Sequence, residues 1–203
     1  LSRLIWAGGT IVAGFAARAS AQATFLGLGS LPGYGDSFQA TMSADGQWQL
    51  VRTFDIARKR YYSEVTPEPV AYYGYGIVTR FLSKYSSPLK DEVMDSGPIP
   101  GTFLTVTLKS PAGNLTTYLL NLGTSPIPVA VQFEGLTNGL QLNVYQATEA
   151  AVSKPGYRMD PLRQIKLELQ EPRLQENLPP LSITVVTSYR LKHADNGIGF
   201  DSQ

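Results

Sequence analysis

Alternation between apolar and polar positions is the clearest pattern in the second half of the chain. Residues 103–110 and 115–122 both alternate, and the turn-forming sequence Pro-Ala-Gly-Asn separates them, so they predict a β-hairpin. A second hairpin is predicted for residues 129–136 and 140–147, because Asn-Gly lies between these alternating runs. The β-branched run at residues 181–192 predicts a long strand.

The remaining elements are weaker in pattern. Residues 46–56 alternate after a Ser-Ala-Asp-Gly turn and predict a strand, whereas residues 77–84 carry apolar side chains at helical spacing. Residues 146–154 fit a helical turn, and residues 160–169 fit either a helix or a strand. Short antiparallel strands with turns between them predict a mainly β fold, an antiparallel sandwich or jelly-roll-like domain with one or two short helices.

A hydrophobic N-terminal segment precedes this domain. Arg3 is followed by apolar or small residues through position 17, and Ala19 and Ala21 form the small-x-small pattern of a leader cleavage signal. The apolar run suits an export leader, and a bilayer span needs about 20 apolar residues. Residues 1–21 are therefore expected to be an export leader or a retained hydrophobic segment. Residues 22–40 follow as a glycine-rich arm, and residues 41–203 as a single β-rich domain.

A local resemblance adds to this picture. The stretch at residues 23–54 contains Gly-Leu-Gly-Ser-Leu-Pro-Gly and then Met-Ser-Ala-Asp-Gly, and it resembles a single unit of the HAF-repeat family of exported bacterial proteins. That family repeats the unit in tandem, whereas this chain has one copy and ends it with Leu-Val-Arg in place of Val-Gly. The resemblance implies an exported β-repeat protein and transfers no catalytic residue.

Most signatures of catalysis are missing from the sequence. The chain has no cysteine and one histidine, His193, which excludes thiol catalysis, thiolate metal sites and histidine clusters. No Gly-x-Ser-x-Gly elbow is present, and the glycines near position 27 lack the context of a phosphate loop. We therefore expect no cofactor, no metal, no catalytic residue and no enzymatic activity.

One surface-like feature combines basic and aromatic side chains. Such interleaved residues suit contacts with a partner, a glycan or a single strand, although tyrosines bordering a β core would give the same pattern. The residues of this possible partner-contact patch are Arg58, Arg60, Tyr61, Tyr62, Tyr72, Tyr73 and Tyr75.

Charge and composition then narrow the function. The net charge is +1 and only 16% of residues are charged, so the chain carries no basic footprint for nucleic acid. The expected function is an exported, non-catalytic structural or assembly protein: a surface, filament or accessory subunit whose partners are copies of itself or subunits of a larger assembly. Its expected location is the periplasm or cell surface, with an organelle lumen as the alternative.

Three other functions stay open at this point. An uncleaved N-terminal segment would anchor an accessory subunit in a membrane complex, and membrane contact is expected only in that case. A virion coat protein would use the same β domain. A glycan hydrolase would use a pair of carboxylates, which sequence alone cannot bring together.

Overall fold

The structure is a computed structural model of the 203-residue chain. It describes residues 4–5, 8–9, 12, 51–55, 60–67, 69–82, 85–89, 102–136, 138–170, 172–189, 191–194 and 197–200. The glycine-rich arm, Ala19, Ala21 and Arg58 lie outside these residues. Within the part of the chain that is described, no helix is long and apolar enough to cross a membrane.

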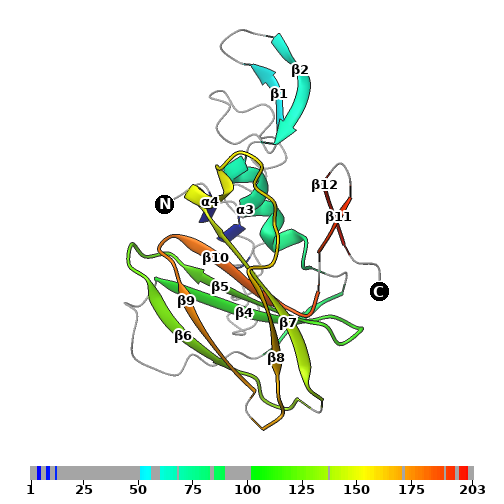
Figure 1. The fold of residues 1–203 in the computed structure, drawn as a ribbon, viewed down its shortest axis with the longest axis vertical. Coiled ribbons are helices and arrows are strands. Elements are labelled where there is room, and N and C mark those ends of the chain that lie inside the picture. The colour runs from blue at the N-terminus through cyan, green and yellow to red at the C-terminus, as the bar shows by residue number, and fades with distance from the viewer. Residues whose placement is uncertain are drawn as a thin grey trace, which may run out of the picture.

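A six-stranded antiparallel sheet forms the centre of the molecule (Figure 1). Its spatial order is β3 (Ser87–Pro88), β4 (Phe103–Lys109), β5 (Leu115–Asn121), β10 (Ser182–Thr187), β7 (Leu140–Thr148) and β8 (Arg163–Leu167). Strand β10 lies between β5 and β7 in the sheet, although it comes long after both of them in the sequence. The centre of the sheet is therefore formed by long-range pairing.

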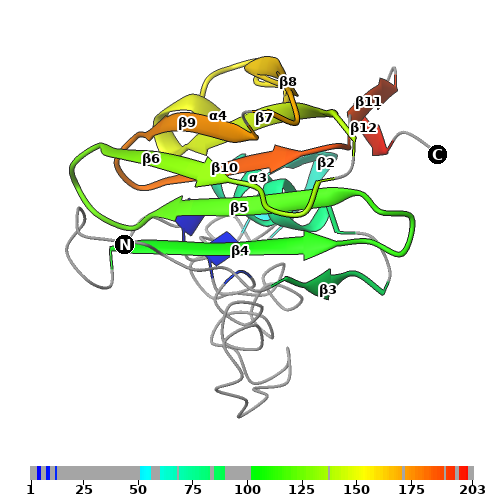
Figure 2. The ribbon, with the colours of Figure 1, turned by 90° about the horizontal axis from the view of Figure 1, so that it is seen from below.

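Two different layers cover the two faces of this sheet (Figures 1 and 2). Helices α3 (Pro69–Thr79) and α4 (Glu149–Val152) lie on one face, over a core that includes Tyr118, Tyr145 and Val185. The antiparallel pair β6 (Ile127–Gln132) and β9 (Arg173–Leu178) covers the other. The fold is therefore sandwich-like on the β6–β9 side and has a helical layer on its opposite side.

Two smaller hairpins are also described. Strands β1 (Val51–Asp55) and β2 (Arg60–Pro67) pair at one end of the longest axis, and β11 (Leu191–Ala194) pairs with β12 (Gly197–Phe200) near the C-terminal end (Figure 1). The mainly β fold with antiparallel sheets and with the short helices α3 and α4 among the described residues confirms the predicted fold class.

The first predicted hairpin is confirmed and the second is wrong. β4 and β5 pair around the turn at Gly113, where a φ of +87° requires a glycine. The Asn138-Gly139 turn, by contrast, does not join two paired strands. β6 pairs with β9, and both edges of β7 are taken by β10 and β8. The chain thus crosses from one layer to the other, because pairing and burial on both sides of β7 outweigh a local turn preference.

The other elements differ less from their predicted boundaries. The helix expected at residues 77–84 begins earlier and spans Pro69–Thr79, and proline suits a first helical position. The helical turn at residues 146–154 narrows to α4, whose N-cap Thr148 accepts a hydrogen bond from the Ala151 amide at 3.2 Å. The ambiguous run at residues 160–169 contains strand β8.

Asn121, at the end of β5, ties the two β layers together. Its side chain is fully buried, and its amide nitrogen lies within hydrogen-bonding distance of the carbonyl oxygens of Ser125, Leu178 and Pro179, at 2.8, 3.1 and 2.9 Å. Its carbonyl oxygen accepts the Gly123 amide at 2.9 Å. A single polar side chain therefore provides hydrogen-bond partners for backbone groups in both the β5–β6 and the β9–β10 connections.

The replacement Asn121→Ala is expected to lower the free energy of unfolding by about 2–4 kcal/mol, because several buried backbone groups lose their partner. Gln141→Ala is the matched control: its exposed amide makes one 3.4 Å contact with Gln164, so a change within about 0.5 kcal/mol is expected. Denaturant unfolding of both variants measures the difference. Equal effects would mean that Asn121 does not hold the layers together.

Candidate functional site

The candidate site is an open groove of about 780 Å³ between the β6–β9 pair and the β7–β8 side of the central sheet. Its size falls within the range of about 300–1,000 Å³ that is usual for small-molecule sites. The lining residues come from four strands and the connection before β8: Pro128, Val129, Ala130, Val144, Gln146, Leu162, Arg163, Gln175, Glu176 and Asn177.

The groove is built around an ion pair between Arg163 and Glu176. Glu176 lies on the inward face of β9, between the buried side chains of Leu174 and Leu178, and only 8% of its side chain is exposed. Arg163 is the first residue of β8, and its Nη2 also donates to the Gln175 carbonyl oxygen at 3.0 Å. The arginine keeps half of its side chain exposed, at 50%, so the pair faces solvent through its cationic side.

This pair also explains why a charge is tolerated within an apolar layer. A carboxylate taken out of water is costly unless a charged partner and hydrogen bonds compensate it. Arg163 supplies the charge from the neighbouring sheet, and in doing so it links the β6–β9 layer to the edge of the central sheet. The groove therefore has a preorganised polar centre.

Amide and apolar groups surround this centre. Gln146, on β7, donates to the Thr184 hydroxyl at 3.1 Å, while Gln175 and Asn177 are exposed on β9. Leu162 lines the groove with 63% of its surface exposed. The lining thus combines planar hydrogen-bonding side chains with apolar surface, which suits an uncharged, hydroxyl-rich ligand.

The partner-contact patch expected from the sequence is only partly described. Arg60, Tyr61 and Tyr62 lie on β2, whose side chains are not described, and Arg58 lies outside the described residues. Tyr72, Tyr73 and Tyr75 lie on α3 and are each half-buried, far from the groove in the fold because α3 covers the opposite face of the sheet. His193 lies on β11, also without a described side chain.

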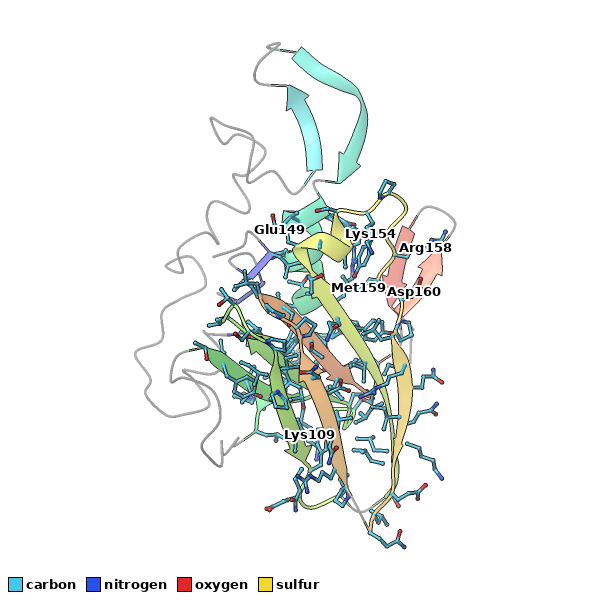
Figure 3. The ribbon with its side chains drawn as sticks, turned by 60° about the vertical axis from the view of Figure 1, so that its left-hand side comes forward. Lys109, Glu149, Lys154, Arg158, Met159 and Asp160 are labelled. Carbon is cyan, nitrogen blue, oxygen red and sulfur yellow. The ribbon has the colours of Figure 1, made fainter. Side chains whose placement is uncertain are left out.

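The tyrosines on α3 make contacts within the protein. The Tyr73 hydroxyl donates to the Tyr157 carbonyl oxygen at 3.0 Å, and the two rings meet edge to face with centroids 4.6 Å apart. Arg80 Nη2 donates to the Tyr72 hydroxyl at 2.9 Å, and Nη1 lies 3.9 Å from the Met159 sulfur. Figure 3 shows that the connection carrying Met159 follows α4. These contacts pin that connection onto α3.

Burial changes the acidity of this cluster. Burial, followed by the neighbouring Tyr73 and Asp160 charges, raises the pKa of Tyr157 to about 12. Burial also raises the pKa of Tyr73 and, at the centre of the sheet, that of Tyr118, whose hydroxyl donates to the Val78 carbonyl oxygen at 2.8 Å.

The groove itself was missed at the level of sequence. Its residues lie between positions 128 and 177 in separate strands. The pairing of β6 with β9 and of β7 with β8, together with the packing of the two sheets, brings them together. One signal was present: Glu176 alternates with Leu174 and Leu178, which places a carboxylate on the apolar face of a strand. Among the described residues, no group of three or more histidine, cysteine, aspartate or glutamate side chains could hold a metal.

A scan against protein-family models and a search of curated proteins both find no match. Solved structures do show similarity. A GH30 endoxylanase from Clostridium papyrosolvens C71 is 15% identical, with 60% of this chain and 28% of that chain covered and a TM-score of 0.43. The GH30 xylanase Xyn30A from Clostridium acetobutylicum is 14% identical, with 66% and 30% covered and a TM-score of 0.43.

The endoglucanase Cel44A of Clostridium thermocellum gives a similar result, at 13% identity, with 59% of this chain and 23% of that chain covered and a TM-score of 0.43. This chain spans between 23 and 30% of the length of these three proteins. At such identities, coverages and TM-scores the likeness is partial and carries no statement about activity.

These neighbours correct the function expected from the sequence. The solved structures to which the chain is similar are those of glycoside hydrolases, and this finding contradicts the expectation of a non-catalytic structural or self-assembling protein without enzymatic activity. The expectation rested on the lack of local catalytic motifs. Local motifs say nothing about carboxylates and amides that separate strands bring together, and the groove is built in that way.

The pKa of Tyr157 predicts a pH dependence of stability. The phenol ionises near pH 10 in the unfolded chain and near pH 12 in the folded protein, so the unfolded state loses its proton first. The stabilising contribution is fully present below pH 10 and is lost as the pH rises toward 12, by up to about 2–3 kcal/mol.

Denaturant unfolding across this alkaline range measures that loss. Tyr157→Phe keeps the ring contact with Tyr73 and removes the Tyr157 hydroxyl, so it should reduce the fall in stability, and Tyr73 and Tyr118 account for what remains. Tyr85→Phe, on a ring that is 76% exposed, should leave the fall unchanged. A fall of the same size in all three proteins would contradict the assignment to Tyr157.

Proposed function

We propose that this chain is part of a carbohydrate-active protein of the glycan hydrolase class, and that the groove at Arg163 and Glu176 binds a segment of glycan. The observation that carries the proposal is a largely buried carboxylate paired with an arginine inside a groove that also presents amide side chains and apolar surface. Glycans are also the substrates of the xylanases and the endoglucanase compared above.

The chemistry of a sugar ring fits this lining. Neighbouring hydroxyls of a sugar donate to and accept from planar groups, so the exposed parts of the Arg163 and Asn177 side chains can engage them in pairs. The apolar C–H face of the ring can pack on Leu162 and Val129. A neutral polymer would gain affinity here without requiring a strongly charged site.

Hydrolysis itself requires two carboxyl groups at a defined separation, about 5–5.5 Å or 6.5–9.5 Å. Among the residues lining the groove, Glu176 is the one carboxylate. We therefore propose glycan binding, and not bond cleavage, as the role of the groove.

Calorimetric titration with xylan and cellulose oligosaccharides tests the proposal. Arg163→Ala should weaken binding by at least about tenfold, because a charged hydrogen bond contributes about 1.5–3 kcal/mol. Lys166→Ala is the matched control on the same strand: Lys166 pairs with Glu168 at 2.8 Å, is exposed, and does not line the groove. Its binding should equal that of the unchanged protein.

A second variant separates binding from folding. Asn177→Ala removes an exposed amide from the groove without touching the ion pair, and it should weaken binding while leaving thermal unfolding unchanged. The proposal fails if the unchanged protein binds neither oligosaccharide. It also fails if Arg163→Ala and Lys166→Ala, both folded, bind glycan equally well.

A further inference from the structure

Described residues near the start of the chain form part of the core on the face opposite the groove. Leu4, Ile5 and Val12 are helical and exposed by 0, 1 and 0%. Their spacing places them on one side of a helix. They belong to the same buried cluster as Val78 on α3 and Ile183 on β10. In Figure 1 the short blue ribbons lie beside α3, over the central sheet.

Two glycines allow this segment to lie directly against α3. A Cβ atom added to Gly8 would lie 2.4 Å from the Gly74 carbonyl oxygen and 2.5 Å from the Ile183 Cδ1 atom. A Cβ added to Gly74 would lie 2.7 Å from the Leu4 carbonyl oxygen. Backbone therefore meets backbone from both sides, at distances that no other residue type permits.

A third contact fixes the segment on the sheet. A Cβ added to Gly9 would lie 3.3 Å from the Leu120 Cδ2 atom, so the segment also packs closely on β5. The surface it covers is apolar: Val78, Leu120 and Ile183 are each exposed by 0% in its presence. Removing the segment would bring these side chains into water, at a cost proportional to the area uncovered.

We propose that the helical residues Leu4, Ile5, Gly8, Gly9 and Val12 are an integral part of the folded core, packed against α3, β5 and β10, and that they remain there when the chain is cut between Arg18 and Ala19. The same apolar residues that fit an export leader thus serve as a core element. The segment that covers this surface of α3, β5 and β10 belongs to the same chain. The glycine-to-glycine contact argues for this assignment, because a helix of other composition could not approach α3 as closely.

Cleavage of the full chain tests the inference. A recognition site for a specific protease is inserted between Arg18 and Ala19, the folded protein is cut, and size-exclusion chromatography with mass spectrometry follows the N-terminal fragment. We expect the fragment to co-elute with the remainder and to be released only when the protein unfolds. A fragment that separates from a remainder of unchanged thermal stability would overturn the inference.

Two alanine variants on the same helix sharpen the result. In Gly74→Ala the new methyl group meets the Leu4 backbone, so the cut fragment should leave at least about tenfold faster than from the unchanged protein. Gly76→Ala is the matched control. The three atoms nearest to a Cβ added at Gly76 all belong to the Arg80 side chain, the closest at 3.3 Å, so release of the fragment should be unchanged. Equal release from both variants would overturn the inference.

Hydrogen exchange covers the case in which Gly74→Ala does not fold. In the unchanged protein the amides of Leu4, Ile5, Gly8, Gly9 and Val12 should exchange as slowly as those of β10; rapid exchange would overturn the inference. Mixing cut proteins of two isotopic masses tests the second possible occupant. Dimers whose N-terminal fragments exchange between copies would mean that the surface of α3, β5 and β10 is covered by the segment of a second copy. That result would overturn the assignment of the segment to the same chain.

Discussion

The structure depends on the burial of the central strands on both faces. Every residue of β5 and of β10 is buried, and β10 is hydrogen-bonded to β5 on one side and β7 on the other. Such a strand cannot form the outer wall of a simple two-layer domain, because each face needs its own cover. The helical layer and the β6–β9 pair supply the two covers, and the positions of both follow from this need.

The groove arises because the β6–β9 pair covers only part of the central sheet. A two-stranded pair is narrower than a six-stranded sheet, so β6 and β9 leave lining residues of β7 and the β8 edge accessible. At this boundary a strand can carry a carboxylate on its inner face, because a partner from the neighbouring sheet can reach it. The Arg163–Glu176 pair has that geometry. It links two layers, and it leaves the cationic group available to a ligand.

The opposite face shows how a tight helical layer is assembled without large side chains at the crossing. Gly8 and Gly74 let backbone approach backbone. The Tyr118 hydroxyl, from β5, donates to the Val78 carbonyl oxygen on α3. The tyrosines of α3 then hold the connection after α4 in place. Within the predicted partner-contact patch, Tyr72 and Tyr73 have hydrogen-bond and ring partners inside the chain.

Local sequence determined the elements that depend on local interactions. The β4–β5 hairpin, the strand β10, the turn of α4 and the mainly β class follow from alternation, β-branching and capping within short windows. The tertiary structure alone decided which strands pair. The Asn138-Gly139 turn predicted a hairpin, yet burial on both faces directed β6 to β9 and β7 to β10. The groove shares this origin: Arg163 and Glu176 lie in separate strands, and no local pattern could place one against the other, because their contact exists only once the two layers are packed.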